Sequence, residues 1–342
     1  MDKTNFRNLH AMIIKAESIA ISMHVRPDGD CIGTAEALRL ALVDMGKKVD
    51  VFTDGQIPSH FSYLDGIKKF RQCKVDEWCS SCAAGSKKSK AKYLYDLMII
   101  IDTGDEHRVG ACQELKFRCR RVVVFDHHLN PTIDADLIVS NPTRASVGEM
   151  MFEYFRKHKI NITKPMAEAL YTAVSSDTGC FLFPNTTAYT HEVASELLNI
   201  GIDVANINYS NFRVYDPKTL KGLMEVLRRI QFINKGKIAI TYLDRKLVKK
   251  YDFNHDERHR FQRYASDASG VMVSIFLTEQ TRDSFNVSLR SHGDVNVASV
   301  AADLGGGGHK NASGLTMEGK YKDVIKKIVE RVEKELKLTK SQ

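Results

Sequence analysis

The sequence has no uninterrupted run of 18 apolar residues, which is about the length that a membrane-spanning helix needs. An integral membrane protein is therefore not expected. The first twenty residues also lack a basic segment followed by an apolar stretch and a small-residue cleavage site. We accordingly expect no secretory signal and a cytoplasmic protein.

Cysteine is scarce, with seven in 342 residues, and the odd number argues against a disulfide framework. Cys73, Cys79 and Cys82 lie in a polar stretch that is rich in Ser, Lys and Gly up to Lys92. Cys79 and Cys82 have the spacing of half a zinc site, with Cys73 as an available third thiolate, but a structural zinc usually has four protein ligands. A redox pair usually begins a helix after a strand instead. We interpret the stretch as a surface insertion and leave zinc binding open.

Length and composition are typical of a water-soluble protein of two domains, with 43% hydrophobic and 27% charged residues among 342. The net charge of +8 favours anionic partners, which include nucleotides and nucleic acids. Many of the lysines lie in the tail 320–340, which we interpret as a solvated amphipathic helix without a functional role.

Apolar, β-branched runs alternate with helical periodicity in the first half of the chain. This pattern predicts an α/β domain, with a parallel sheet that carries helices on both faces. The runs span residues 19–25, 47–52, 96–102 and 121–126. Further helices are expected between the first two runs, over 145–158 and over 165–177.

The second half predicts a smaller α+β domain. Residues 201–226 are polar and helical in pattern, and we interpret them as a linker between a catalytic domain, 1–200, and a substrate-binding domain, 227–342. Strands are expected near 237–243, 270–277 and 283–291, followed by a helix, a glycine-rich stretch and a final helix. The active site is expected in the cleft between the two domains.

The candidate catalytic residues follow the predicted strands. His24, Asp28 and Asp30 stand in the sequence HVRPDGD directly after the first run, although Pro-Asp-Gly is also a favourable turn by itself. Asp102 ends the apolar run LMIII, where a carboxylate is costly to desolvate unless it meets a cation or hydrogen-bond donors.

Two further motifs are FDHH, with Asp126, His127 and His128, and SSDTG, with Asp177 at the end of a predicted helix. Each motif alone is consistent with a cap or a turn. The carboxyl ends of parallel strands meet at one edge of a sheet, so together the motifs predict a metal site.

Carboxylate and imidazole donors suit Mn²⁺, with Mg²⁺, Co²⁺, Fe²⁺ or Zn²⁺ as substitutes. Two neighbouring divalent ions can activate a water and neutralise phosphoryl oxygens. The donor set therefore predicts phosphoester hydrolysis.

The motifs in this order, together with GGGGHKNASG, resemble the DHH phosphoesterase superfamily over nearly the whole chain. The resemblance is to stand-alone members with a DHH-associated C-terminal domain, such as nanoRNases and pAp phosphatases. It implies that His24 and Asp28 hold one ion, that Asp30, His127 and Asp177 hold the other, and that Asp102 bridges both. It further implies a metal-bridging hydroxide as nucleophile, His128 beside the scissile phosphate and Asp126 orienting the histidines.

Substrate contacts are expected mainly in the second domain. Gly306, Gly307 and Gly308 lack side chains, so backbone amides there can approach a phosphate, although a flexible loop is the alternative. His309 and Arg290 could then donate to a phosphate, the latter through its planar fork. The expected contacts from the first domain are Arg144 and Ser146.

The predicted function is hydrolysis of short oligoribonucleotides, pApA or cyclic di-AMP, and possible substrates include pAp. A homodimer is compatible with the resemblance, and no long nucleic acid is expected. An inorganic pyrophosphatase is disfavoured because GGGGH replaces a clustered basic motif, and a RecJ-like exonuclease because no oligonucleotide-binding domain is evident. A nucleotide-binding protein without turnover would lack a metal ligand, and none is missing.

Overall fold

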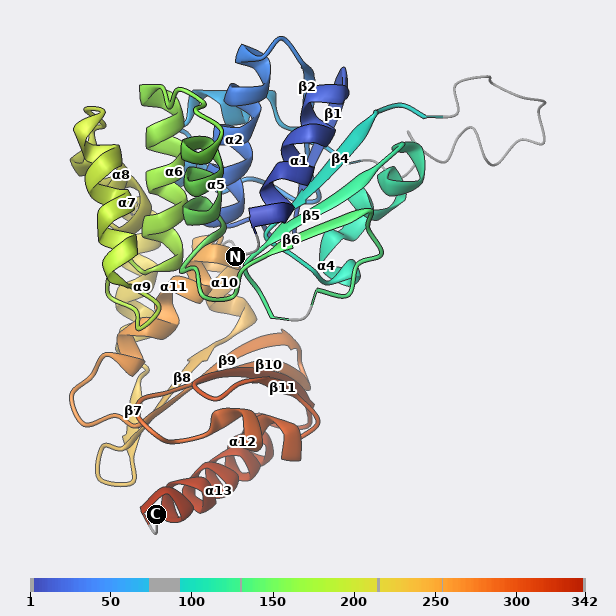
Figure 1. Ribbon diagram of the computed structural model, residues 1–342. Coiled ribbons are helices and arrows are strands. Elements are labelled where there is room, and N and C mark those ends of the chain that lie inside the picture. Colours follow the sequence, from blue (N-terminus) through green and yellow to red (C-terminus); the bar gives the residue numbers. More distant parts are fainter. Residues whose placement is uncertain (1–2, 74–92, 130, 214–215, 254, 341–342) are drawn as a thin grey trace. The chain divides into compact units, whose positions relative to one another are not determined.

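The computed structural model describes residues 3–73, 93–129, 131–213, 216–253 and 255–340 (Figure 1). Its contacts divide the chain into two compact units, Met1–Val214 and Tyr215–Gln342. The division falls inside the stretch predicted as a linker. Helix α8 (Val204–Phe212) packs against α6 (Lys164–Asp177) in the first unit, whereas α9 (Pro217–Leu227) packs against α10 (Arg245–Tyr251) and α11 (His255–Ser266) in the second.

The first unit contains a sheet of six parallel strands in the order β3-β2-β1-β4-β5-β6. Four of them match the predicted apolar runs, while β3 and β6 are short and were not predicted. The strands are β1 (Ser18–Met23), β2 (Lys48–Thr53), β3 (Arg71–Gln72), β4 (Leu97–Ile101), β5 (Val122–Asp126) and β6 (Leu137–Ser140).

Alternate residues of these strands are buried on opposite faces, as a sheet covered on both sides requires. Ile19 and Ile21 face one apolar core together with residues of the helices α1 (Lys3–Lys15), α2 (Gly29–Asp44), α5 (Val147–Lys157) and α6. Ala20 and Met98 face the other core, beneath the short helix α4 (Glu106–Val109) and the 3-10 segment η3 (Gly110–Arg118). The prediction of an α/β domain with both faces covered is confirmed.

The remaining elements of this unit lie around the larger core. Helix α7 (Ala188–Asn199) packs against α5 and α6, and the 3-10 helices η1 (Ser59–Phe61) and η2 (Asp65–Lys69) pack against α8 and α2 respectively.

Two glycines allow α2 to approach α6 closely. A Cβ on Gly33 would lie 2.2 Å from the backbone oxygen of Ala169, and a Cβ on Gly29 would lie 2.6 Å from the Ser176 side chain. Neither glycine has a positive φ. Gly29 is therefore needed for the close contact between the two helices and not for the turn that Pro-Asp-Gly suggested. As a consequence, the first residues of α2 lie beside Asp177, the last residue of α6.

The second unit contains a mixed sheet in the order β11-β12-β10-β9-β8-β7, in which only β8 and β9 are parallel. Its strands are β7 (Gln231–Ile233), β8 (Ile238–Leu243), β9 (Val273–Thr281), β10 (Ser284–Ser291), β11 (Gly307–His309) and β12 (Ala312–Glu318). The helices α12 (Val297–Asp303) and α13 (Tyr321–Lys340) share an apolar core with one face. The predicted α+β character is confirmed.

The glycine-rich stretch is an edge strand. Gly307–His309 form β11, which among the described strands pairs only with β12. A Cβ on Gly306 would lie 2.4 Å from the backbone oxygen of Gly314, and one on Gly308 would lie 2.5 Å from Ser313 Cα, whereas Gly307 has open space. Two of these glycines are thus required by close backbone packing.

Arg290 and His309 both pair with Ala312, one from β10 and the other from β11. Directly opposed residues of antiparallel strands point to the same face of a sheet. Leu289, next to Arg290, is buried in the core with α12 and α13, so the Arg290 face is the opposite one. Arg290 and His309 are both exposed.

Within the described part of the chain, none of Cys31, Cys73, Cys112, Cys119 and Cys180 forms a disulfide. Cys73 is buried in the smaller core of the first unit, so it does not belong to a surface insertion as the sequence suggested. Its proposed zinc partners Cys79 and Cys82 lie outside the described residues. Within the described ranges, no helix is both long and apolar enough to cross a membrane.

Candidate metal centre

The candidate centre lies at the carboxyl ends of β1, β4 and β5. His24 follows β1, Asp102 follows β4, and Asp126 ends β5. The sheet order reverses at β1 and β4, since β2 lies on one side of β1 and β4 on the other. Such a switch point is where open parallel sheets bind ligands.

Asp102 has an unusual backbone. Its φ is 62°, in the left-handed region that costs a non-glycine residue about 1–3 kcal/mol. Its N–H donates to the backbone oxygen of Phe125 over 3.0 Å, and this bond holds the residue against β5. The strain therefore occurs at a position where the neighbouring strand holds the backbone.

The first donor group consists of His24, Asp28 and Asp102. His24 Nε2 lies 3.5 Å from Asp28 Oδ2 and 3.3 Å from Asp102 Oδ2. His24 Nδ1 donates to the backbone oxygen of Val25 over 2.8 Å, which leaves Nε2 as the atom with a lone pair. This buried Nε2 has no hydrogen-bond partner in the described structure.

Asp28 has two separate tasks. Its Oδ1 accepts from the N–H groups of Asp30 and Cys31 over 3.1 and 3.2 Å and thereby caps α2. Its Oδ2 faces His24. The cap therefore fixes the carboxylate that the first donor group uses.

The second donor group consists of Asp30, His127 and Asp177, with Asp102 at its side. His127 Nε2 lies 3.2 Å from Asp177 Oδ2, 3.5 Å from Asp102 Oδ1 and 3.8 Å from Asp30 Oδ2. His127 Nδ1 donates to the backbone oxygen of Arg144 over 3.1 Å, so its Nε2 is also the free atom.

In the second group, the backbone of α5 holds the carboxylate of Asp30, and an amide side chain holds the backbone of Asp177. Asp30 is fully buried and accepts from the N–H groups of Val147 and Gly148 over 2.7 and 2.9 Å, at the positive end of α5. The Asn185 side chain donates to the backbone oxygen of Asp177 over 3.1 Å.

Asp102 connects the two groups, because its Oδ2 faces His24 and its Oδ1 faces His127. Its buried Oδ1 has no hydrogen-bond partner among the residues described. A buried carboxylate oxygen and a buried imidazole nitrogen without partners are costly unless a cation satisfies them.

The electrostatics of the cluster indicate the same deficit of positive charge. Burial, together with repulsion from Asp102 and Asp177, raises the pKa of Asp30 well above its usual range. Burial also raises the pKa of Asp102 and of Asp177. For His24, burial lowers the pKa, but Cys31 and the carboxylates of Asp102 and Asp28 outweigh it and raise the pKa overall.

Divalent cations would supply the missing charge. The six residues expected from the sequence, His24, Asp28, Asp30, Asp102, His127 and Asp177, thus fit two ions that share Asp102.

His128 and Asp126 form a separate pair beside the donors. Asp126 Oδ1 accepts from the N–H groups of His127 and His128 over 2.8 and 3.2 Å and from His128 Nδ1 over 2.8 Å. This hydrogen bond to Asp126 raises the pKa of His128. Asp126 therefore fixes the ring of His128, whereas the ring of His127 is fixed by the Arg144 carbonyl.

The structure places the side chains of Arg144 and Ser146 in supporting contacts. The guanidinium of Arg144 donates to Glu153 over 2.7 Å and lies 3.8 Å from the ring centroid of Tyr189. The fully buried hydroxyl of Ser146 accepts from the N–H of Glu149 over 3.1 Å and caps α5. Both residues thus support the donors, Arg144 through His127 and Ser146 through the helix end that holds Asp30.

Cys31 was not identified from the sequence as a candidate ligand. Its Sγ lies within 4.8 Å of donor atoms of His24, Asp28 and Asp102, and burial raises its pKa to about 12. Its position one residue after Asp30 and three after Asp28, in the first turn of a predicted helix, was the available signal.

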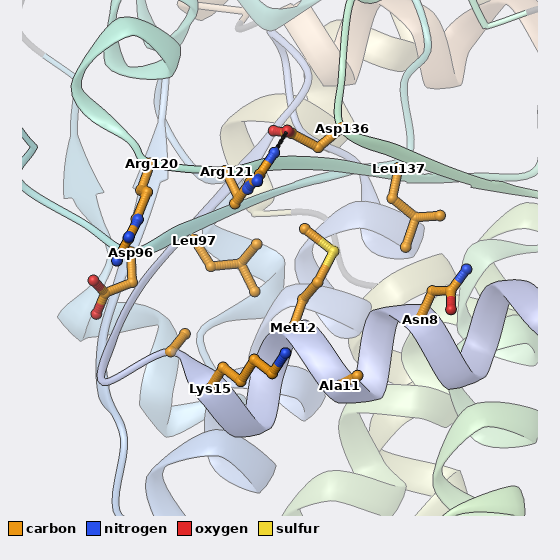
Figure 2. Close-up of a pocket in the computed structure, with 11 residues that line it drawn as sticks. Asn8, Ala11, Met12, Lys15, Asp96, Leu97, Arg120, Arg121, Asp136 and Leu137 are labelled. Atoms are coloured by element: carbon orange, nitrogen blue, oxygen red, sulfur yellow. Dashed lines mark hydrogen bonds and ion pairs between the residues drawn. The ribbon is translucent and has the colours of Figure 1, made fainter.

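A separate hollow of about 610 Å³ lies at the opposite edge of the same sheet, between α1 and the beginnings of β4 and β6 (Figure 2). Lys15, Arg120 and Arg121 contribute cations to its lining, and Arg121 is paired with Asp136. The hollow lies at the amino ends of the strands, whereas the candidate metal centre lies at their carboxyl ends, so the two sites are distinct.

Comparison with known proteins gives the family. A model of the N-terminal domain of the DHH family matches residues 18–174, and a model of the DHHA1 domain matches residues 236–338. The chain belongs to the DHH superfamily. The resemblance stated from the motifs is therefore confirmed.

Two DHH relatives are described as bifunctional oligoribonuclease and PAP phosphatase NrnA. The protein of Thermus thermophilus is 28% identical over 337 residues, covering 96% of this chain and 94% of the relative. That of Bacillus subtilis is 25% identical over 308 residues, covering 88% and 90%. The cyclic-di-AMP phosphodiesterase GdpP of Geobacillus thermodenitrificans is 24% identical and covers 88% of this chain, which spans 45% of that longer protein.

Solved DHH structures agree with the fold. An exopolyphosphatase-related protein from Bacteroides fragilis has a TM-score of 0.88 and 26% identity, covering 99% of this chain and 98% of its own. RecJ from Thermus thermophilus, solved in complex with Mn²⁺, has a TM-score of 0.53 at 14% identity and covers 97% of this chain and 55% of RecJ. This second likeness shows the fold alone.

Proposed function

We propose that the chain hydrolyses phosphodiester bonds in short oligoribonucleotides and dinucleotides, and the phosphomonoester of pAp, with two divalent ions. The observation that carries the proposal is the cluster of six candidate metal donors, which form two groups with Asp102 in common. The relatives named as oligoribonuclease and PAP phosphatase match over most of both chains, which confirms the predicted class of phosphoesterase.

The donor set of imidazoles and carboxylates makes Mn²⁺ the proposed ion. When bound, two such ions supply an activated water and neutralise charge on the phosphoryl oxygens. The protein contributes the positions of the donors: backbone bonds to Val25 and Arg144 fix the two histidine rings, and helix ends fix Asp28 and Asp30.

His128 is the proposed proton donor to the leaving oxygen. Its Nδ1 is occupied by Asp126, so Nε2 is the atom available to a substrate, and the raised pKa favours the protonated ring. A general acid with a pKa near the working pH is the most effective. Asp126 acts through His128 and through the two backbone N–H groups that it accepts.

In the second unit we propose Arg290, His309 and the backbone of Gly306, Gly307 and Gly308 as the substrate-binding residues. Arg290 and His309 share one sheet face, with the small Ala312 between them. β11 is an edge strand, so one side of its backbone is free of strand pairing within the described part of the sheet. A guanidinium fork and the unpaired backbone N–H groups of an edge strand are suited to phosphate. The N–H of Gly306 donates to the backbone oxygen of Ala301 over 2.7 Å, so Gly306 contributes its lack of a side chain and not its N–H.

The test is a panel of initial rates in Mn²⁺ with pAp, pApA, cyclic di-AMP, a 5′-phosphorylated RNA trimer, an RNA 20-mer and pyrophosphate. The blank is the double variant Asp126→Ala/His127→Ala. Selective turnover of the short nucleotides is expected. Cleavage of pyrophosphate alone, or of the 20-mer alone, would place the chain elsewhere in the superfamily, and no cleavage at all would favour a binding protein.

Asp102→Ala tests the shared carboxylate. We expect the loss of measurable turnover on every substrate of the panel, because the change removes the one donor common to both groups. Metal content per chain, measured by mass spectrometry after dialysis, should fall as well. Retained turnover with two bound ions would contradict the proposed centre.

A further inference from the structure

Cys31 lies in the first donor group. It belongs to the first turn of α2 and is fully buried. Its Sγ lies within 4.8 Å of donor atoms of His24, Asp28 and Asp102, which also lie within that distance of one another. Its thiol donates to the backbone oxygen of Asp28 over 3.4 Å, so the sulfur is held at the end of the helix that carries Asp28 and Asp30.

The other three donors are already spaced as ligands of one ion. Two atoms that lie about 2.0–2.1 Å from a tetrahedral ion are separated by about 3.3 Å. His24 Nε2 is 3.3 Å from Asp102 Oδ2 and 3.5 Å from Asp28 Oδ2. The His24 side chain is only 3% exposed, and its Nε2 has no hydrogen-bond partner in the described parts of the chain.

We propose that the Cys31 thiolate is the fourth ligand of the ion held by His24, Asp28 and Asp102, and that it makes this position selective for a thiophilic ion such as Zn²⁺, Fe²⁺ or Co²⁺. Thiolate ligands favour such ions, whereas oxygen ligands favour Mg²⁺ and Mn²⁺. Binding forms one sulfur–metal bond, breaks the S–H bond and releases one proton to the solvent.

The second donor group differs in this respect. Its candidate ligands in the described structure are the imidazole of His127 and the carboxylates of Asp30 and Asp177. His127 also clusters with Asp102 and His128, and neither cluster contains a sulfur. This group keeps the preference for Mn²⁺ that its donors imply. The centre is therefore asymmetric, with a thiophilic ion beside a harder one.

The inference rests on the two-ion centre of the proposed function, and cobalt spectroscopy tests it without turnover. Metal-free full-length protein is titrated with Co²⁺, and the near-ultraviolet thiolate-to-cobalt band is recorded together with the visible bands of bound cobalt. The parent carries Cys79→Ser and Cys82→Ser, because this pair could bind cobalt by itself. We expect a band of one thiolate per cobalt in the parent.

Cys31→Ser in this parent should remove the thiolate band while the visible bands of bound cobalt remain. Cys180→Ser is the matched control, since Cys180 lies only three residues from Asp177 but belongs to neither donor group, and it should leave the band unchanged. Circular dichroism verifies that each variant is folded. A thiolate band that persists in Cys31→Ser, or bound cobalt without such a band in the parent, would overturn the inference.

A competition experiment measures the selectivity itself. After dialysis with one equivalent of Zn²⁺ per chain in a large excess of Mn²⁺, the parent should retain one zinc and one manganese per chain; the excess is needed because an imidazole–carboxylate site also binds Zn²⁺ more tightly than Mn²⁺. Cys31→Ser should bind zinc at least about tenfold more weakly by calorimetry, with unchanged affinity for manganese. Equal zinc affinity in both proteins contradicts the inference. A normal thiolate band without turnover on the substrate panel would instead contradict the proposed function and leave the cysteine ligand standing.

Discussion

Gly33→Ala perturbs the contact that positions α2 against α6. Alanine has the higher helix propensity, by about 1 kcal/mol, so at an exposed helical site the change would stabilise the protein. Here the added Cβ would lie 2.2 Å from the backbone oxygen of Ala169 and 2.9 Å from the backbone nitrogen of Ala173. Neither atom belongs to a side chain that can rotate away.

The size of the effect follows from these distances. Ordinary van der Waals contact begins near 3.4 Å, so the two helices must separate locally by about 1.2 Å, the difference between 3.4 and 2.2 Å. Overpacking of this kind costs about 1–3 kcal/mol. After subtraction of the propensity gain, we expect the free energy of unfolding to fall by up to about 2 kcal/mol.

The same displacement should weaken metal binding, because Asp30 is carried by α2 and Asp177 by α6. Ligand positions in metal sites tolerate only about 0.2 Å, so we expect a drop of roughly tenfold or more in Mn²⁺ affinity. Urea unfolding and calorimetry measure the two effects. Gly307→Ala, where an added Cβ meets no atom within 4 Å, is the matched control for both. A Gly33→Ala protein that is more stable than the wild type and binds Mn²⁺ normally would refute this reasoning.

Two other changes separate structural from functional roles. Ser146→Ala should lower the free energy of unfolding by about 1 kcal/mol through the lost cap of α5, with KM unchanged in the substrate panel, whereas a rise in KM at unchanged stability would show a substrate contact instead. The rings of His10 and His158 are stacked, with their centroids 4.0 Å apart, and burial is the main cause that lowers the pKa of each ring from 6.5. Below pH 6.5 the unfolded chain therefore binds more protons than the folded chain. The free energy of unfolding consequently falls as the pH drops through 6.5. Between pH 7.5 and 5.5 the melting temperature of His158→Gln should therefore fall less than that of the wild type. An equal fall in both proteins would show that these two histidines do not cause the pH dependence.

The long parallel strands were predictable because their sequences are apolar on both faces. Residues 96–102 and 121–126 contain almost no polar residue before the final aspartate, and both became central strands. Strand β6 was missed because it has four residues at the sheet edge and only one of them is buried. Helix α1 was not predicted, although Phe6, Leu9 and Ile13 recur at helical intervals and pack into the larger core.

The proposed metal donors that follow strands could be placed together from the sequence, because strand ends fix their position. A carboxylate or imidazole directly after a buried strand can only lie at the carboxyl edge of the sheet, as His24 and Asp102 do. The neighbours of the donors were less accessible to sequence reasoning. The Arg144 carbonyl that orients His127 carries no side-chain signal, and the close approach of Gly33 to Ala169 depends on how two distant helices pack.

The glycine-rich stretch shows the same limit. Four consecutive glycines indicate either a loop or a close backbone approach, and the sequence does not distinguish which of them meets a neighbour. Pairing with β12 decides this, since a Cβ added at Gly306 or Gly308 would meet the backbone of β12, whereas one added at Gly307 would meet no atom within 4 Å.

The donors of the metal centre come from segments that are far apart along the chain, from His24 to Asp177. Bound ions would therefore act as cross-links that close long loops and hold β1, α2, β4, β5 and α6 at one point. Because the unfolded chain cannot assemble these donors, every tenfold rise in free metal above the dissociation constant would add about 1.4 kcal/mol to the stability of the first unit. A chelator would thus loosen the domain as well as stop the reaction, and the supply of metal would govern how long the protein persists.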